Sequence, residues 1–92
     1  MAETIIVIPC YDEADRLAPD AFVAFAEKYP GVDFLLVNDG SRDRTLAVLQ
    51  ELHDRAPARF SVLDQQPNRG KAEAVRIGLN AAIESGAHYV GC

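Results

Sequence analysis

The residues best suited to chemistry in this sequence lie in three polar segments, and each segment follows a short apolar run. The segments are residues 10–13, 38–43 and 67–71. They combine carboxylates with a tyrosine ring and a lysine. Side chains of these kinds can accept hydrogen bonds from N–H groups, lie along a planar ring and balance a negative charge. The three segments are therefore the candidate functional residues.

Two familiar nucleotide-binding motifs are absent from these segments, and a third class of protein does not account for them. A dinucleotide-binding fingerprint needs glycines directly after the first strand, and residues 9–14 contain none. A P-loop fails because Gln65 stands where its first glycine belongs and Ala72 replaces the magnesium-binding Ser or Thr. A receiver-type signalling domain would use Asp64 as its phosphoacceptor, but it would leave residues 38–41 without a function.

A cysteine and an arginine at phosphatase spacing form a further candidate. Cys10 and Arg16 follow an apolar run with five residues between them. However, Asp12, Glu13 and Asp15 lie in the same loop, and their negative charge would repel a phosphate. The same charge is expected to raise the pKa of the Cys10 thiol instead of lowering it. Phosphatase chemistry is therefore not expected.

The polar segments need elements that position them, and the hydrophobic pattern predicts alternating strands and helices. Apolar strand starts at Ile5, Phe34, Phe60 and Tyr89 recur about 26 to 29 residues apart, the length of one βα unit. Helical spacing of apolar residues lies between them, with Pro19 in a first turn and Gly86 as a C-terminal cap. This pattern predicts an α/β fold with a parallel sheet. Ligands then bind where the strands end.

Composition and charge bound the function. The chain has 92 residues, 49% of them hydrophobic, which suits one globular domain. Its net charge of −5 argues against nucleic acid as a partner. The first residues do not have the pattern of a secretory leader, so secretion is not expected, and no apolar run is long enough to span a membrane. Cys10 and Cys92 form no CxxC pair, which indicates reduced thiols and a cytoplasmic location.

Four blocks of residues resemble a known family. The nucleotide-binding half of family 2 glycosyltransferases with the GT-A fold is similar to residues 8–13, 37–45, 68–71 and 74–78, and the resemblance covers essentially the whole chain. The most similar members are the polyprenyl-phosphate and dolichyl-phosphate sugar transferases. The resemblance implies a three-layer α/β/α, Rossmann-like arrangement with about four parallel strands in the order 3-2-1-4.

The resemblance also implies a set of residues that bind the nucleotide. Asp39 would accept a hydrogen bond from a base N–H, Tyr11 would lie along the base or ribose, and Glu13 would accept from ribose hydroxyls. Lys71 would balance the diphosphate, and Pro9 belongs to the same matching block. Each has a structural alternative: Asp39 as a turn residue, the others as solvated loop residues.

Two positions depart from the family pattern. Asp12 stands where the family often has Asn, and residues 72–73 replace a further glycine after Lys71. Glu73 therefore leaves open whether Lys71 faces the ligand or this neighbouring carboxylate. In the second polar segment, Ser41 and Asp43 are expected to cap the following helix.

The function implied by the resemblance is sugar transfer. A nucleotide-diphosphate sugar, preferably a UDP-sugar, would donate to a hydroxyl, saccharide or polyprenyl-phosphate acceptor with inversion, assisted by Mg²⁺ or Mn²⁺. Residues 1–92 would form the N-terminal nucleotide-sugar-binding part, ending before the Asp-x-Asp metal motif, so we expect no catalytic or metal-binding residues and no turnover from this chain alone. The alternative is a nucleotide-binding or interaction module without catalysis. The edge of the fourth strand is expected to promote self-association.

Overall fold

Strands and helices alternate along the whole described chain. The computed structural model describes residues 3–92. The elements are β1 (Thr4–Cys10), α1 (Pro19–Lys28), β2 (Val32–Asp39), α2 (Thr45–Arg55), β3 (Phe60–Gln65), α3 (Lys71–Glu84) and β4 (Tyr89–Gly91). Pro19 is the first residue of α1, as predicted. Gly86 follows α3 with a φ of 91°, and its N–H donates to the carbonyl of Ile83 at 3.0 Å, as expected of a C-terminal cap.

The four strands form one parallel sheet in the order β3-β2-β1-β4. This confirms the order that the family resemblance implied. The register pairs Cys10 with Asn38, and Asp39 with Gln65, so β1, β2 and β3 end at the same edge of the sheet. The three polar segments therefore begin side by side. β4 pairs only with β1 and forms the opposite edge of the sheet from β3.

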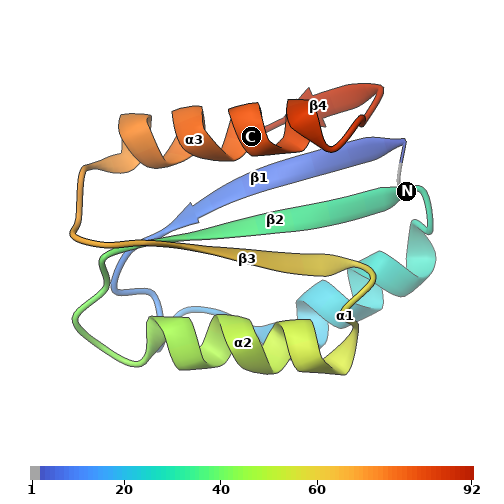
Figure 1. The fold of residues 1–92 in the computed structure, drawn as a ribbon. Coiled ribbons are helices and arrows are strands. Elements are labelled where there is room, and N and C mark those ends of the chain that lie inside the picture. The colour runs from blue at the N-terminus through green and yellow to red at the C-terminus, as the bar shows by residue number, and fades with distance from the viewer. Residues whose placement is uncertain (1–2) are drawn as a thin grey trace.

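Helices cover both faces of the sheet, with α1 and α2 on one face and α3 on the other (Figure 1). This is the three-layer arrangement that was expected. Successive residues of β2 point to opposite faces, so Leu36 packs in the cluster with α2 while Val37 packs in the cluster with α3. Both side chains are almost fully buried. An apolar run without alternation is what a strand covered on both faces requires.

α3 approaches the sheet closely at Gly78. A Cβ placed on Gly78 would lie 2.4 Å from Cγ1 of Val7 and 3.0 Å from Cγ2 of Val37, both of which are fully buried. The absence of a side chain at Gly78 therefore sets how near α3 comes to β1 and β2.

An arginine ties the opposite end of the sheet together. The guanidinium of Arg59 donates to the Asp33 carboxylate at 2.8 Å and to the backbone carbonyls of Ala26, Tyr29 and Val32 at 2.7, 2.7 and 2.5 Å. Two of these carbonyls belong to the end of α1, where helix carbonyls lack partners in the helix itself. Arg59 thus joins α1, β2 and the start of β3. Within residues 3–92, no helix combines the length and apolar character that a membrane crossing requires.

Candidate functional site

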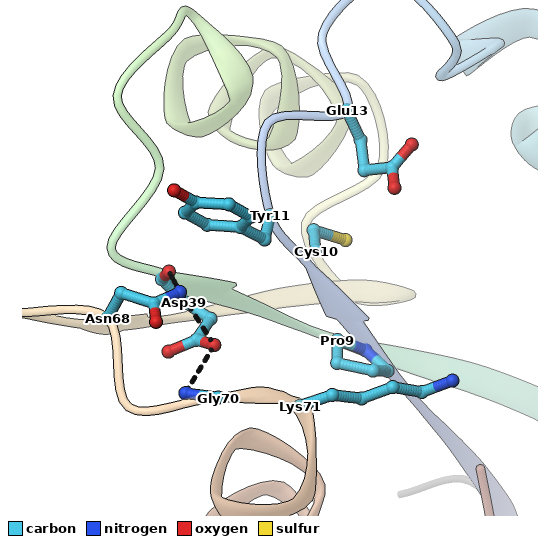
Figure 2. A pocket seen from close by; sticks show the side chains of 8 residues that line it. All are labelled: Pro9, Cys10, Tyr11, Glu13, Asp39, Asn68, Gly70 and Lys71. Carbon is cyan, nitrogen blue, oxygen red and sulfur yellow. Dashed lines mark hydrogen bonds between the residues drawn. The ribbon is translucent and has the colours of Figure 1, made fainter.

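A cavity of about 380 Å³ lies at the edge where β1, β2 and β3 end. Its volume falls within the usual range for small-molecule sites. All five residues predicted from the sequence line it, together with three that were not predicted as site residues: Pro9, Tyr11, Glu13, Asp39 and Lys71, then Cys10, Asn68 and Gly70. Figure 2 shows the Tyr11 ring on one side of the cavity and the Lys71 side chain on the other.

Asp39 anchors the loop that precedes α3. Its side chain is at the end of β2 and the residue is 2% exposed. One carboxylate oxygen accepts the backbone N–H of Arg69 at 2.8 Å, and the other accepts the N–H of Gly70 at 3.0 Å and Nδ2 of Asn68 at 3.1 Å. An ionised carboxylate offers about four acceptor positions, so about one is left for a ligand. The sequence analysis gave Asp39 a ligand role or a turn role, but not this attachment to a second loop.

The glycine after Asp39 allows this loop to lie directly against β2. Gly40 has a φ of 59°, a left-handed conformation that favours glycine, and a Cβ there would lie 2.2 Å from the backbone nitrogen of Asn68. Nδ2 of Asn68 also donates to the backbone carbonyl of Asp39 at 2.8 Å. Asn68 therefore joins the two loops. The sequence signals for this role are its position in a polar loop, two residues before a glycine, and its place in the matching block 68–71.

Side chains after β2 also hold the loop after β1. The backbone N–H groups of residues 12, 13 and 14 donate to Ser41 Oγ, Thr45 Oγ1 and Asp43 Oδ2 at 3.1, 2.8 and 3.3 Å. Three alternate side chains between residues 41 and 45 thus accept hydrogen bonds from three consecutive backbone amides of the loop after β1. The loop that carries Tyr11 and Glu13 is consequently fixed on the end of β2 and the start of α2.

The expected helix caps differ from what is observed. Ser41 does not cap α2, because its hydroxyl donates to Oδ1 of Asn38 at 2.5 Å and accepts from the loop after β1. Asp43 does accept the N–H of Thr45, the first residue of α2, at 2.9 Å. The hydrogen bond from the Thr45 hydroxyl, and then this backbone bond, hold the pKa of the Asp43 carboxyl below its ordinary value. The sequence pattern could not reveal that Ser41 has a partner from another loop.

Cys10 lies in the cavity wall as an unreactive thiol. Burial, and then the charge of Glu13, raise the pKa of the Cys10 thiol to about 11. This confirms the predicted direction of the shift. Arg16 does not face the thiol as a phosphatase arginine would, because its guanidinium donates two hydrogen bonds to the Glu13 carboxylate at 2.8 and 2.7 Å.

The question raised by Glu73 is answered by its neighbour on α3. Nε of Arg76 donates to the Glu73 carboxylate at 2.9 Å, and this bond and the positive charge hold the pKa of Glu73 below its ordinary value. Within residues 3–92 the ammonium of Lys71 makes no ion pair. Lys71 is exposed at the first position of α3 and lines the cavity, so it is available to an anion there.

The described residues do not form a metal site. No group of three His, Cys, Asp or Glu side chains among residues 3–92 is arranged to hold a metal ion. The carboxylate of Asp39 accepts hydrogen bonds from three N–H groups. The positive ends of these groups point toward the carboxylate, so they would repel a metal cation bound to the same oxygens. These residues therefore do not by themselves fit the divalent metal, for which the family resemblance implied ligands after residue 92.

A parallel α/β sheet with a cavity at its carboxyl edge defines a Rossmann-like protein, and the cavity lies where such sheets usually bind ligands. The family model described as glycosyl transferase family 2 matches residues 5–90, and the chain belongs to this family. The resemblance stated from the sequence is thereby confirmed.

Known relatives and a solved structure agree with this assignment. Poly-beta-1,6-N-acetyl-D-glucosamine synthase from Staphylococcus aureus strain MSSA476 is 32% identical over 86 residues, which cover 94% of this chain and 20% of that protein. The Staphylococcus epidermidis protein of the same name is 30% identical over 89 residues, with the same coverage. This chain therefore spans about a fifth of the length of the curated relatives it matches.

The fold is shared with a mannosyltransferase, PcManGT from Pyrobaculum calidifontis, whose structure was solved in complex with GDP-Man and Mn²⁺. The TM-score is 0.69 at 20% sequence identity, over 92% of this chain and 24% of that one. At this identity the likeness shows the fold, which is the GT-A arrangement.

Proposed function

We propose that this chain is the N-terminal nucleotide-sugar-binding part of a family 2 glycosyltransferase and that its ligand occupies the cavity at the carboxyl edge of the sheet. The observation that carries the proposal is the convergence of an aromatic ring, two carboxylates and a lysine on one cavity of about 380 Å³. These groups match a base, a ribose and a diphosphate. Tyr11 would lie along the base, and Asp39 would accept its N–H group.

The hydrogen bonds of Asp39 favour uracil as the base. About one acceptor position of its carboxylate stays free once the three N–H groups of the anchored loop are counted. Uracil presents one ring N–H between two carbonyls, which needs one acceptor. Guanine presents an N–H and an amino group side by side, which need two. A UDP-sugar is therefore the proposed donor.

The remaining cavity residues suit the ribose and the diphosphate. Glu13 accepts two bonds from Arg16, and its other acceptor positions are proposed to take the ribose hydroxyls. Lys71 stands at the start of α3, and among residues 3–92 no side chain caps the first N–H groups of this helix. A lysine next to free N–H groups at a helix start is a favourable place for phosphate oxygens.

The transfer step belongs, in this proposal, to the whole protein. An acceptor hydroxyl or lipid phosphate would attack the anomeric carbon with inversion. The metal, when bound, would neutralise the departing diphosphate from ligands outside the residues described, such as an Asp-x-Asp motif after residue 92. Residues 1–92 would then bind the donor without turnover. The sugar acceptor, the cytoplasmic location and self-association at β4 stay predictions.

Calorimetry with fragments of the ligand tests the assignment. Replacing Tyr11 with Leu is expected to weaken the binding of uridine and UDP by about 1–3 kcal/mol, which is the usual contribution of one base stacked on an aromatic side chain. The binding of pyrophosphate should be unchanged. Replacing Lys71 with Gln is expected to weaken the binding of UDP and pyrophosphate by about 1.5–3 kcal/mol and to leave the binding of uridine unchanged. The matched control is Lys28→Gln, because Lys28 is exposed at the end of α1, outside the cavity.

The same titrations test the choice of base. GDP is expected to bind at least about tenfold more weakly than UDP, because one donor of guanine would be left without a partner. Equal affinity for the two nucleotides would refute the uracil assignment alone. No binding of either nucleotide at millimolar concentration, or equal UDP affinity in all variants, would refute the proposed site.

A further inference from the structure

A salt bridge joins the two loops beside the cavity. The Asp12 carboxylate accepts the backbone N–H of Arg42 at 2.7 Å, and its second oxygen accepts Nε and Nη2 of the same arginine at 3.2 and 3.0 Å. The backbone N–H of Arg42, with its guanidinium, holds the pKa of the Asp12 carboxyl below its ordinary value. The pair is therefore charged at neutral pH.

The backbone of Asp12 is in a conformation that needs support. Its φ of 49° makes it the one residue other than glycine with a positive φ among residues 3–92. Asp is one of the few residue types that adopt this conformation at low cost, but it remains uncommon. The chain turns sharply here, directly after Tyr11, so the direction of the Tyr11 side chain depends on this turn being held.

Arg42 also reaches Tyr11 itself. Its guanidinium carbon lies 5.8 Å from the centroid of the Tyr11 ring, which is the distance of a cation–π contact. Tyr11 is 39% exposed and lines the cavity, so Arg42 contacts the ring without enclosing it. A single arginine thus holds the turn after Tyr11 and touches its ring.

We propose that Arg42, paired with Asp12, is the positioning residue that fixes Tyr11 for the base of the bound nucleotide. This rests on the proposed function for the identity of the ligand. In this role Arg42 acts on the base only through Tyr11. It makes no contact with the diphosphate, which is the role given to Lys71 across the cavity.

Binding measurements distinguish this role from a general electrostatic one. Replacing Arg42 with Gln is expected to lower the affinity for UDP and uridine about threefold to tenfold, the size expected when one of several interacting contacts is lost. The affinity for pyrophosphate should be unchanged. Arg44→Gln removes the same charge from the same loop, where Arg44 is exposed, and is expected to have no effect. In the Tyr11→Leu protein, Arg42→Gln is expected to cause no further loss.

Two more variants test the partner and the chemistry. Asp12→Asn keeps a residue type that tolerates the positive φ but removes the charge, so it should reproduce the loss seen with Arg42→Gln and add nothing to it. Arg42→Lys keeps a cation that can pair with Asp12, so it should restore part of the affinity.

A measurement without ligand keeps the inference independent of the proposed function. The ring resonances of Tyr11 in a ¹H–¹³C spectrum should move in Arg42→Gln and Asp12→Asn but not in Arg44→Gln. Unmoved ring signals in the first two variants would overturn the inference whatever the ligand is. If the wild-type protein binds UDP and Arg42→Gln binds it equally well, the inference fails and the proposed function stands. A loss of pyrophosphate affinity in Arg42→Gln would mean that Arg42 contacts the phosphates directly, which also overturns it.

Discussion

Replacing Gly78 with Ala tests whether the close packing of α3 on the sheet limits stability. Two effects of opposite sign compete. In a helix interior, alanine is more favourable than glycine by about 1 kcal/mol. Against this, the new Cβ would lie 2.4 Å from Cγ1 of Val7 and 3.0 Å from Cγ2 of Val37, where ordinary carbon contacts are about 3.5–4.0 Å.

The packing term is expected to exceed the helix term. Val7 and Val37 are fully buried and β-branched, so neither side chain can rotate away cheaply, and α3 must instead shift from the sheet. Inserting a methyl group into such a core costs about 1–3 kcal/mol, and a contact of 2.4 Å belongs at the upper end of that range. We therefore expect Gly78→Ala to lower the free energy of unfolding by about 1–2 kcal/mol after subtraction of the helix gain.

Urea denaturation followed by circular dichroism measures this change. The matched control is Gly31→Ala, where a Cβ would meet nothing within 4 Å and the stability should be unchanged or slightly higher. Adding Val7→Ala to Gly78→Ala should remove the closer of the two contacts, so that the double variant loses less than the sum of the single losses. A Gly78→Ala protein as stable as the wild type would show that α3 adjusts freely and that the reasoning is wrong.

Two further predictions concern Arg59 and the cysteines. Arg59→Met should lower the free energy of unfolding by at least about 2 kcal/mol, because four oxygens lose a charged donor; Arg55→Met, whose partner is 95% exposed, should cost less than about 1 kcal/mol in the same urea titration. Iodoacetamide at pH 8 should modify exposed Cys92 but not Cys10, as read by peptide mass spectrometry. The raised pKa of the Cys10 thiol favours its protonated form in the folded state. Its contribution to the free energy of unfolding, and its resistance to iodoacetamide, should therefore be lost as the pH rises from about 9 toward about 11. Comparable losses in the two arginine variants, or rapid modification of native Cys10 at pH 8, would contradict these accounts.

The sequence predicted the sheet and the meeting of the candidate residues at one edge because both depend on patterns that lie along the chain. Apolar runs marked the four strands, and the ends of parallel strands meet at one edge, so residues as distant as Tyr11 and Lys71 had to approach each other. The partners of polar side chains were not predictable in this way. Ser41 was expected to cap a helix but bonds to another loop, and Asp39 was expected to face a ligand but also holds three N–H groups.

Such partners depend on contacts between loops about thirty residues apart, which no local pattern encodes. Asp12 shows this most clearly. From the sequence it was a mild departure from the family pattern, and only the structure pairs it with Arg42 and gives it a positive φ. The asparagine that joins the two loops, Asn68, was visible in the sequence as part of a matching block, but its bond to a backbone carbonyl was not.

Because the loop before α3 is attached to Asp39 through backbone N–H groups, the conformation of this loop does not depend on the exposed side chain of residue 69. At position 69 the bond to Asp39 is made by the backbone N–H, which every residue except proline possesses, while the side chain of Arg69 is exposed. The conformation of this loop therefore places almost no demand on what residue 69 is. Selection or design can therefore exchange the side chain of residue 69 beside the cavity. Such an exchange could change which ligand is preferred without a loss of stability.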